Sequence, residues 1–177
     1  QPLTRHKIVD TENDVVPLES PAGDPLHIAG IGSLMAKRDK PAVALEMLKD
    51  GAPRLVILHT PTSFGDLPHG SAPLALAGHT HGGQFRLPLT PSWSWVTFLR
   101  QEEVHAEGWI EDYGAQGNRL YVNRGIGFSK IPMRFNCPPE ITWRTLEPSD
   151  SDIVDAAPPI GERKKNVKNV KQTLKSR

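Results

Sequence analysis

The sequence has one cysteine, few aromatic residues and no long hydrophobic run, and each shortage excludes a class of protein. Cys137 alone cannot form an internal disulfide or a thiolate zinc cluster, so any bound metal needs histidine and oxygen ligands. No apolar run approaches the roughly 18 to 20 residues that span a bilayer, and no apolar stretch follows a basic start as in a signal peptide. We expect a cytoplasmic or membrane-peripheral location.

The length and composition are those of one globular domain. The chain has 177 residues, of which 37% are hydrophobic and 23% charged, and these fractions exclude collagen-like, coiled-coil and wholly disordered proteins. It begins with Gln1 instead of methionine. This start predicts a processed product or a segment of a longer protein.

Positive charge is scarce in the body of the chain and concentrated at its end. Residues 1–160 hold 14 lysines and arginines against 19 acidic residues, whereas 161–177 hold seven basic residues and one glutamate. An acidic body argues against nucleic acid as the main ligand. We interpret 148–160 as an acidic, proline-containing linker. The basic tail is either disordered or an amphipathic helix that touches anionic lipid.

The first half has an α/β pattern. Pro41 is placed to open a helix that ends near Gly51. Apolar runs bounded by glycine and proline predict buried strands, and an extended segment precedes them. These segments are Val15–Leu18, Leu26–Ile31, Leu55–Leu58 and Leu74–Ala77.

The second half predicts a mostly antiparallel sheet, because short strand-like runs alternate with connections rich in glycine, proline and asparagine. The runs are Gln84–Leu87, Val104–Ile110, Leu120–Asn123 and Glu140–Leu146.

The chemically specific feature is a glycine-bracketed His-x-His motif. His79 and His81 leave the strand Leu74–Ala77 inside the sequence Gly-His-Thr-His-Gly-Gly, and His59 ends the strand Leu55–Leu58. If both strands share one sheet, the three imidazoles meet at one edge and make most of a metal site. His69 is more typical of a loop residue, and His6, His27 and His105 have no informative spacing.

Four segments resemble the C-terminal half of calcineurin-like metallophosphoesterases, and most closely the bacterial envelope-associated branch that acts on lipid-like substrates. They are Leu-Val-Ile-Leu-His-Thr-Pro (55–61), Leu-Ala-Gly-His-Thr-His-Gly-Gly-Gln (76–84), Leu-Tyr-Val-Asn-Arg-Gly-Ile-Gly (120–127) and Arg-Phe-Asn-Cys-Pro-Pro-Glu-Ile (134–141). The resemblance covers roughly residues 15–147, and we take residues 1–147 as the C-terminal part of a metallophosphoesterase domain.

The resemblance implies a four-layer α-β-β-α sandwich and a phosphoester hydrolase with two divalent metal ions, Mn, Zn or Fe. In the family these metals share an aspartate and a water that attacks phosphorus. His59 and His79 would bind one metal and His81 the other. Arg124 and Gln84 are candidate substrate contacts, although a turn arginine bonded to carbonyls is an equal reading of Arg124.

The upstream part of the family pattern is missing. The family's Asp-x-His, its Gly-Asp with a following Asp and its Asn-His followed by an acidic residue have no counterpart here, and Asp24, Asp39 and Asp66 match no family motif. We therefore expect half of the enzyme, completed by an upstream segment or a partner chain. Alone, it should expose an apolar sheet face and either self-associate or be only partly folded.

Two alternatives stay open. One is a single metal on His59, His79 and His81, open to water. The other is a catalytically silent binding or scaffold module for an anionic partner. Trp93, Trp95 and Phe98 are either core residues or a lipid-facing lip beside the metals.

Overall fold

The computed structural model describes residues 9–19, 25–48, 51–87, 106–110 and 113–146. The chain divides into two units, 1–143 and 144–177, and every described strand and helix lies in the first. The predicted aromatic lip, linker and basic tail lie outside the described residues, as do His6, Asp24 and His105. Within the described part, no helix is long and apolar enough to cross a membrane.

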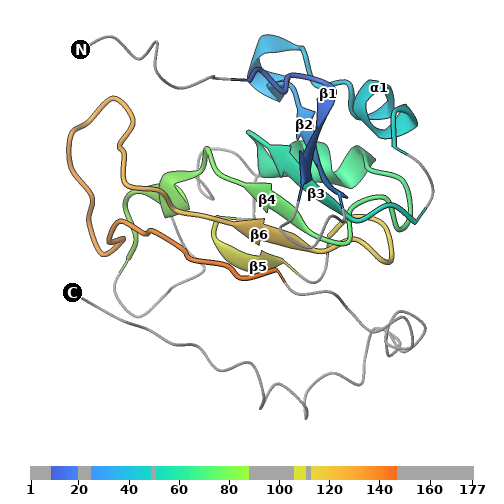
Figure 1. Ribbon diagram of the computed structural model, residues 1–177. Helices are drawn as coiled ribbons and strands as arrows, with labels where there is room; N and C mark the ends of the chain where they lie inside the picture. The colour runs from blue at the N-terminus through green and yellow to red at the C-terminus, as the bar shows by residue number, and fades with distance from the viewer. Residues whose placement is uncertain (1–8, 20–24, 49–50, 88–105, 111–112, 147–177) are drawn as a thin grey trace, which may run out of the picture. The chain divides into compact units, whose positions relative to one another are not determined.

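Six strands form one mixed sheet in the order β1-β2-β3-β4-β6-β5 (Figure 1). The four central strands are parallel, and β1 and β5 run antiparallel to their neighbours at the two edges. The strands are β1 Asp14–Glu19, β2 Pro25–Ile31, β3 Arg54–Leu58, β4 Ala75–Ala77, β5 Gly108–Ile110 and β6 Leu120–Val122. The α/β class and the strands of the first half are as the sequence predicts.

The helices are short. Helix α1 (Pro41–Glu46) begins at the predicted proline, whose fixed φ suits a first helical position, but it ends before Gly51. Three 3-10 helices lie in connections: η2 Leu34–Ala36, η3 Pro61–Asp66 and η4 His81–Gly83.

One face of the sheet carries the core. Alternate residues of the parallel strands, such as Val56 and Leu58 in β3, are buried together with Phe64 and Leu67 from the η3 region and Ala44 from α1. Because side chains alternate along a strand, the intervening residues face the other way.

On that second face, paired residues of four strands form a row, Ile57–Leu76–Tyr121–Trp109. Ile57 and Trp109 are each 42% exposed although both are apolar. The Trp109 and Tyr121 rings meet edge to face at 5.3 Å, so the row is ordered. The four-layer sandwich would need a further layer over this face and stays a proposal.

The antiparallel prediction for the second half is wrong in part. β6 is inserted beside β4 and runs parallel to it, which suits a strand with Leu120 and Val122 buried. Two predicted strands are not strands. Gln84 has φ +58°, which is not an extended conformation. In 140–146 the side chains of Glu140 and Thr142 bond to residues 121–124, at the end of β6 and just after it, and no strand forms.

Candidate functional site

The site forms where the parallel strands β3, β4 and β6 end at the same edge of the sheet. β3 is followed by His59, β4 by Gly78 and β6 by Asn123. The Gly78 N–H donates to the His59 carbonyl at 3.3 Å, and the Asn123 N–H donates to the Ala77 carbonyl at 2.8 Å. The three connections therefore start side by side, as loops at the carboxyl edge of a parallel sheet do.

The structure brings His59 and His79 together. Their ring centroids are 4.6 Å apart and the rings are tilted by 59°. His59 is exposed and His79 half-buried, so the pair can be reached from outside. Neutral imidazoles placed in this way can bind one divalent cation.

The turn after β4 has an unusual backbone. Positive φ angles occur at His79 (68°), His81 (52°), Gly82 (62°), Gly83 (79°) and Gln84 (58°). For a residue with a Cβ this region costs about 1–2 kcal/mol, and three of the five are not glycine. The surroundings must hold the turn in place, and strain of this kind is concentrated at functional sites.

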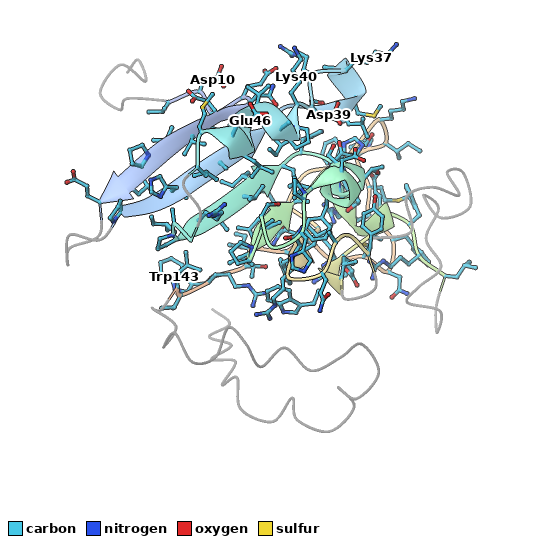
Figure 2. All side chains as sticks on the ribbon, turned by 90° about the vertical axis from the view of Figure 1, so that its right-hand side faces the viewer. Asp10, Lys37, Asp39, Lys40, Glu46 and Trp143 are labelled. Carbon is cyan, nitrogen blue, oxygen red and sulfur yellow. The ribbon has the colours of Figure 1, made fainter. Side chains whose placement is uncertain are left out.

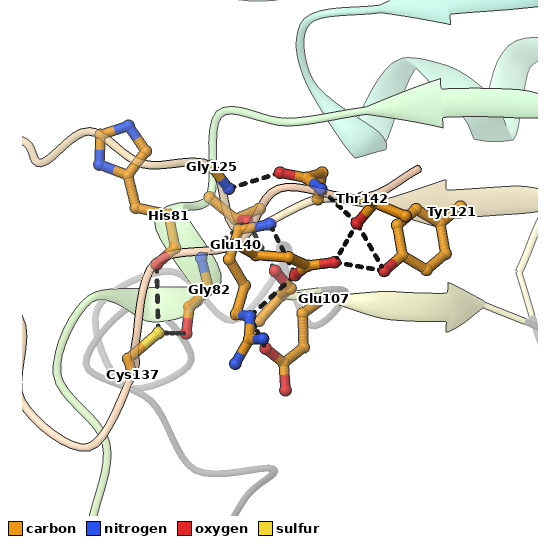
Figure 3. A network of polar contacts seen from close by, with 12 residues as sticks. His81, Gly82, Glu107, Tyr121, Gly125, Cys137, Glu140 and Thr142 are labelled. Atoms are coloured by element: carbon orange, nitrogen blue, oxygen red, sulfur yellow. Dashed lines mark hydrogen bonds and ion pairs between the residues drawn. The ribbon is translucent and has the colours of Figure 1, made fainter. Parts of the chain in front are cut away.

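His81 does not join the other two histidines. Among the described residues, no three His, Cys, Asp or Glu side chains are placed to hold one metal ion. The structure shows the approach of His59 and His79, and metal binding by all three histidines stays a prediction. Figure 3 shows the His81 ring pointing away from the carboxylates of Glu107 and Glu140. Its Nδ1 is buried without a hydrogen-bond partner in the described part of the chain.

Two buried side chains donate hydrogen bonds to the carbonyl oxygens of the turn. Cys137 is buried, and its Sγ donates to the carbonyls of His81 and Gly82 at 3.3 Å each. Arg86, 6% exposed, donates from Nε to the Gly82 carbonyl at 2.7 Å. The Gly82 Cα faces Arg124 and Cys137 so closely that a Cβ there would lie 2.6 Å and 2.7 Å from their side-chain atoms.

Gln84 is engaged in a neighbouring loop. Its Nε2 donates to the carbonyls of Ser129, Ile131 and Met133, and its Oε1 accepts from the Ser129 N–H at 2.8 Å. The side chain is 7% exposed. These contacts favour a positioning role for Gln84 over the substrate contact expected from the sequence.

Arg134 ties three segments together through its guanidinium. Nη1 donates to the His81 carbonyl at 3.2 Å, and Nη2 to the Arg124 and Gly125 carbonyls at 2.8 and 3.1 Å. Nε donates to the Gly127 carbonyl at 2.8 Å. The His81 turn, the connection after β6 and the segment that carries Cys137 are thus fixed to one another.

Arg124 lies between two carboxylates. Its Nε is 2.8 Å from Glu140 and 3.1 Å from Glu107. Burial lowers the pKa of the Arg124 guanidinium, but the bond to Glu140 and the charge of Glu107 outweigh it and raise that pKa. Within the described residues, both contacts use Nε alone. The N–H groups of the two terminal nitrogens, Nη1 and Nη2, therefore remain available as hydrogen-bond donors.

Glu140 accepts from several donors at once. Tyr121, Thr142 and Arg124 all donate to its carboxylate. Burial raises the pKa of Glu140, but these hydrogen bonds outweigh burial and lower the pKa from 4.5 to about 2. The charged carboxylate is therefore favoured in the folded protein.

We expect Glu140 to make folding stability depend on pH in the acid range. Since its pKa is lower when folded, its contribution is complete above pH 4.5 and is lost as the pH falls toward 2. The loss should be roughly 1–3 kcal/mol of unfolding free energy. Urea titrations at several pH values should show this slope in the parent chain and a smaller one in Glu140→Gln. Exposed Glu46→Gln is the control, and an equal change there would contradict the assignment.

The other histidines and aspartates considered in the sequence analysis do not take part in the site at the ends of β3, β4 and β6. His69 is exposed in a loop, and His27 Nδ1 lies 3.2 Å from the Pro53 carbonyl. Asp39 accepts from the Ser63 hydroxyl at 3.2 Å, and Asp66 lies at the end of η3.

Sequence reasoning missed the residues that hold the turn. The last of the four resembling segments contains Arg134, Cys137 and Glu140. The resemblance therefore marked these residues, but it did not indicate what each one contacts. Arg86 and Glu107 carried no signal, because an isolated charged residue is usually on the surface.

Comparison with known proteins gives three informative relatives. The uncharacterized metallophosphoesterase YkuE of Bacillus subtilis is 32% identical over 130 residues, 71% of this chain and 42% of the relative. The phosphodiesterase YaeI of Escherichia coli is 36% identical over 120 residues, 68% of this chain and 41% of the relative. The UDP-2,3-diacylglucosamine pyrophosphatase LpxG of Chlamydia trachomatis is 31% identical over 122 residues, 67% and 36% respectively.

The chain thus spans about two fifths of the length of the curated relatives it matches. No protein-family model matches it, and no solved structure does either.

Proposed function

The chain is related to metallophosphoesterases, and on that basis we propose that it supplies part of the active site of a metal-dependent phosphoester hydrolase. The observation that carries the proposal is the approach of His59 and His79 at the ends of two neighbouring parallel strands. A pair of imidazoles at this position is suited to a divalent cation. It lies at the carboxyl edge of the parallel strands, where α/β proteins place their binding sites.

His59 and His79 would hold one cation and His81 a second, either Mn, Zn or Fe. The buried Nδ1 of His81 without a partner among the described residues fits a ligand role, since an unsatisfied buried nitrogen is costly. When bound, two such cations activate water as a nucleophile and neutralise charge on phosphoryl oxygens.

The described residues do not offer the carboxylate that such a pair of metals needs. Glu107 and Glu140 are near the turn, but both are bound to arginines. We therefore propose that the remaining ligands lie outside the described residues, in an upstream segment or a partner chain. A sheet supplied by that segment or partner would cover the second face of this sheet, which includes Ile57 and Trp109. The two sheets together would complete the four-layer sandwich.

Arg124 is our candidate for substrate binding. Glu140 and Glu107 orient its Nε, and the terminal nitrogens remain for phosphoryl oxygens, which a planar guanidinium recognises well. The name of the Chlamydia relative, which specifies a diacylated sugar nucleotide, supports a lipid-like phosphoester as the substrate class.

Metal content tests the ligand assignment. We expect the chelator-stripped chain, reloaded with Mn²⁺ or Zn²⁺, to retain at most one metal, weakly, because only the His59–His79 pair is assembled. His79→Ala should lower retention at least tenfold, as judged by elemental mass spectrometry. The exposed His69→Ala is the control. Two tightly held metals per chain would contradict the need for outside ligands, and equal loss in both variants would contradict the pair.

Activity tests the hydrolase itself. The chain joined to the N-terminal part of the Bacillus relative should hydrolyse bis(p-nitrophenyl) phosphate with Mn²⁺, and His81→Ala should remove that hydrolysis while the fold persists. No turnover of this or any other phosphoester by a folded, metal-loaded fusion would refute the proposal.

A further inference from the structure

The two carboxylates beside Arg124 differ in how their charge is satisfied. Figure 3 shows Glu107 and Glu140 at one guanidinium. Glu140 accepts hydrogen bonds from two hydroxyl groups and from the Nε and the backbone N–H of Arg124. Oε1 of Glu107 accepts from Arg86, but its Oε2, 3.1 Å from Arg124 Nε, is buried without a hydrogen-bond partner in the described part of the chain. The charge on Glu107 is therefore the less compensated of the two.

Glu107 is held in this position by the turn after β4. The Thr80 hydroxyl donates to the Ala106 carbonyl at 2.6 Å and accepts from the Gly82 N–H at 3.2 Å. Arg86 donates to the Gly82 carbonyl from Nε and to Glu107 from Nη1. Both the backbone before Glu107 and its carboxylate are thus bound to the same turn, so its charge cannot swing away when a ligand arrives.

The donors of Arg124 that remain for a ligand are on the same planar group. Its Nη1 and Nη2 have no hydrogen-bond partner among the described residues and are not buried, unlike Nη2 of Arg86. A phosphoryl group bound to these nitrogens would lie across one guanidinium from Glu107 Oε2. At so short a range, beside a buried oxygen, solvent and salt screen the repulsion between negative charges incompletely.

We propose that Glu107 is a specificity-determining residue, which makes Arg124 accept phosphoryl groups with one negative charge in preference to those with two. A phosphodiester carries one such charge and a phosphomonoester nearly two, since the second pKa of a monoester is about 6. Both kinds of ester can accept the same hydrogen bonds from Arg124, but the repulsion from Glu107 is doubled for the monoester. The substrate class is then a phosphodiester, and this inference rests on the proposed function for Arg124 as the substrate contact.

Binding of small esters tests this selectivity with the full 177-residue chain, in the presence of a chelator and without turnover. Dimethyl phosphate has one negative charge, and methyl phosphate has two at about pH 8. Titrations followed by phosphorus NMR give both affinities. We expect the parent to bind methyl phosphate no more than about twofold more tightly than dimethyl phosphate, and Arg124→Gln to weaken both at least fivefold.

Glu107→Gln should raise both affinities unequally. The gain for methyl phosphate should be about the square of the gain for dimethyl phosphate, roughly ninefold against threefold, because the repulsion that is removed scales with the charge of the ester. A merely structural role would change both by one factor. Glu107→Asp keeps the charge and should keep the parent ratio. Glu46→Gln, which removes an exposed carboxylate from α1 (Figure 2), should change neither affinity.

The proposal is wrong if the parent binds methyl phosphate several-fold more tightly than dimethyl phosphate, if Glu107→Gln changes both affinities by the same factor, or if neither ester binds. Circular dichroism must match the parent; if Glu107→Gln unfolds, the ratio in the parent decides alone. The expected ratios without turnover by the fusion would refute the hydrolase and keep the selectivity. Turnover together with equal factors would refute the selectivity and keep the hydrolase.

Discussion

Gly82→Ala should destabilise the protein by about 2–5 kcal/mol. The new Cβ would lie 2.6 Å from Arg124 Cγ and 2.7 Å from Cys137 Sγ, in a backbone with φ +62°. The positive φ costs about 1–2 kcal/mol for alanine, and overpacking adds about 1–3 kcal/mol. Urea unfolding measures the loss. Metal retention should also fall, because His79 belongs to the turn that must move.

The variant Gly125→Ala separates the cost of the positive φ from the cost of overpacking. Gly125 has nearly the same φ, +64°, but a Cβ there meets no atom within 4 Å. We expect this variant to lose only the backbone part, about 1–2 kcal/mol. Equal losses in the two variants would mean that Arg124 and Cys137 do not crowd the turn, and the account of how His81 is held would be wrong.

Gln84→Ala should cost about 2–4 kcal/mol. The truncation leaves three carbonyls and one N–H of the loop 125–135 without their partner, and each lost hydrogen bond contributes about 0.5–1.5 kcal/mol. The loop should loosen before the sheet does. We therefore expect trypsin to cut after Lys130 faster in this variant, in addition to the lower unfolding free energy in urea.

Gln116→Ala is the matched control. Gln116 is exposed, and we expect its truncation to change stability by no more than about 0.5 kcal/mol. Unchanged cleavage after Lys130 in Gln84→Ala would show that the amide does not hold the loop, and Gln84 would again be a candidate for substrate binding.

The strands of the first half could be predicted because their cause is local. Apolar runs bounded by proline and glycine, such as Leu55–Leu58, leave little choice of structure, and Pro41 marks the start of α1. The pairing of β6 with β4 could not be predicted in this way. It depends on which edge of β4 is free after the turn at 79–84, and turn-rich composition does not encode strand direction.

The same distinction between local and long-range causes applies to the candidate site. Parallel strands bring His59 and His79 together, so their approach follows from two strand ends and one topology rule. The orientation of His81 depends on a positive φ, and that angle depends on Cys137, Arg134 and Arg86, which are distant in sequence. Side-chain bonds to backbone carbonyls follow no periodic pattern, so the residues that hold the turn could be found only in three dimensions.

The strand order also has a consequence for how the protein folds. β5 and β6 are antiparallel neighbours and can pair as a local hairpin, whereas β6 must close a long loop to reach β4. β3 and β4 meet over a shorter loop, so the imidazoles of His59 and His79 can come together before the hairpin docks. If the pair holds a divalent ion as proposed, that ion should speed the joining of β3 to β4 when it is present during refolding.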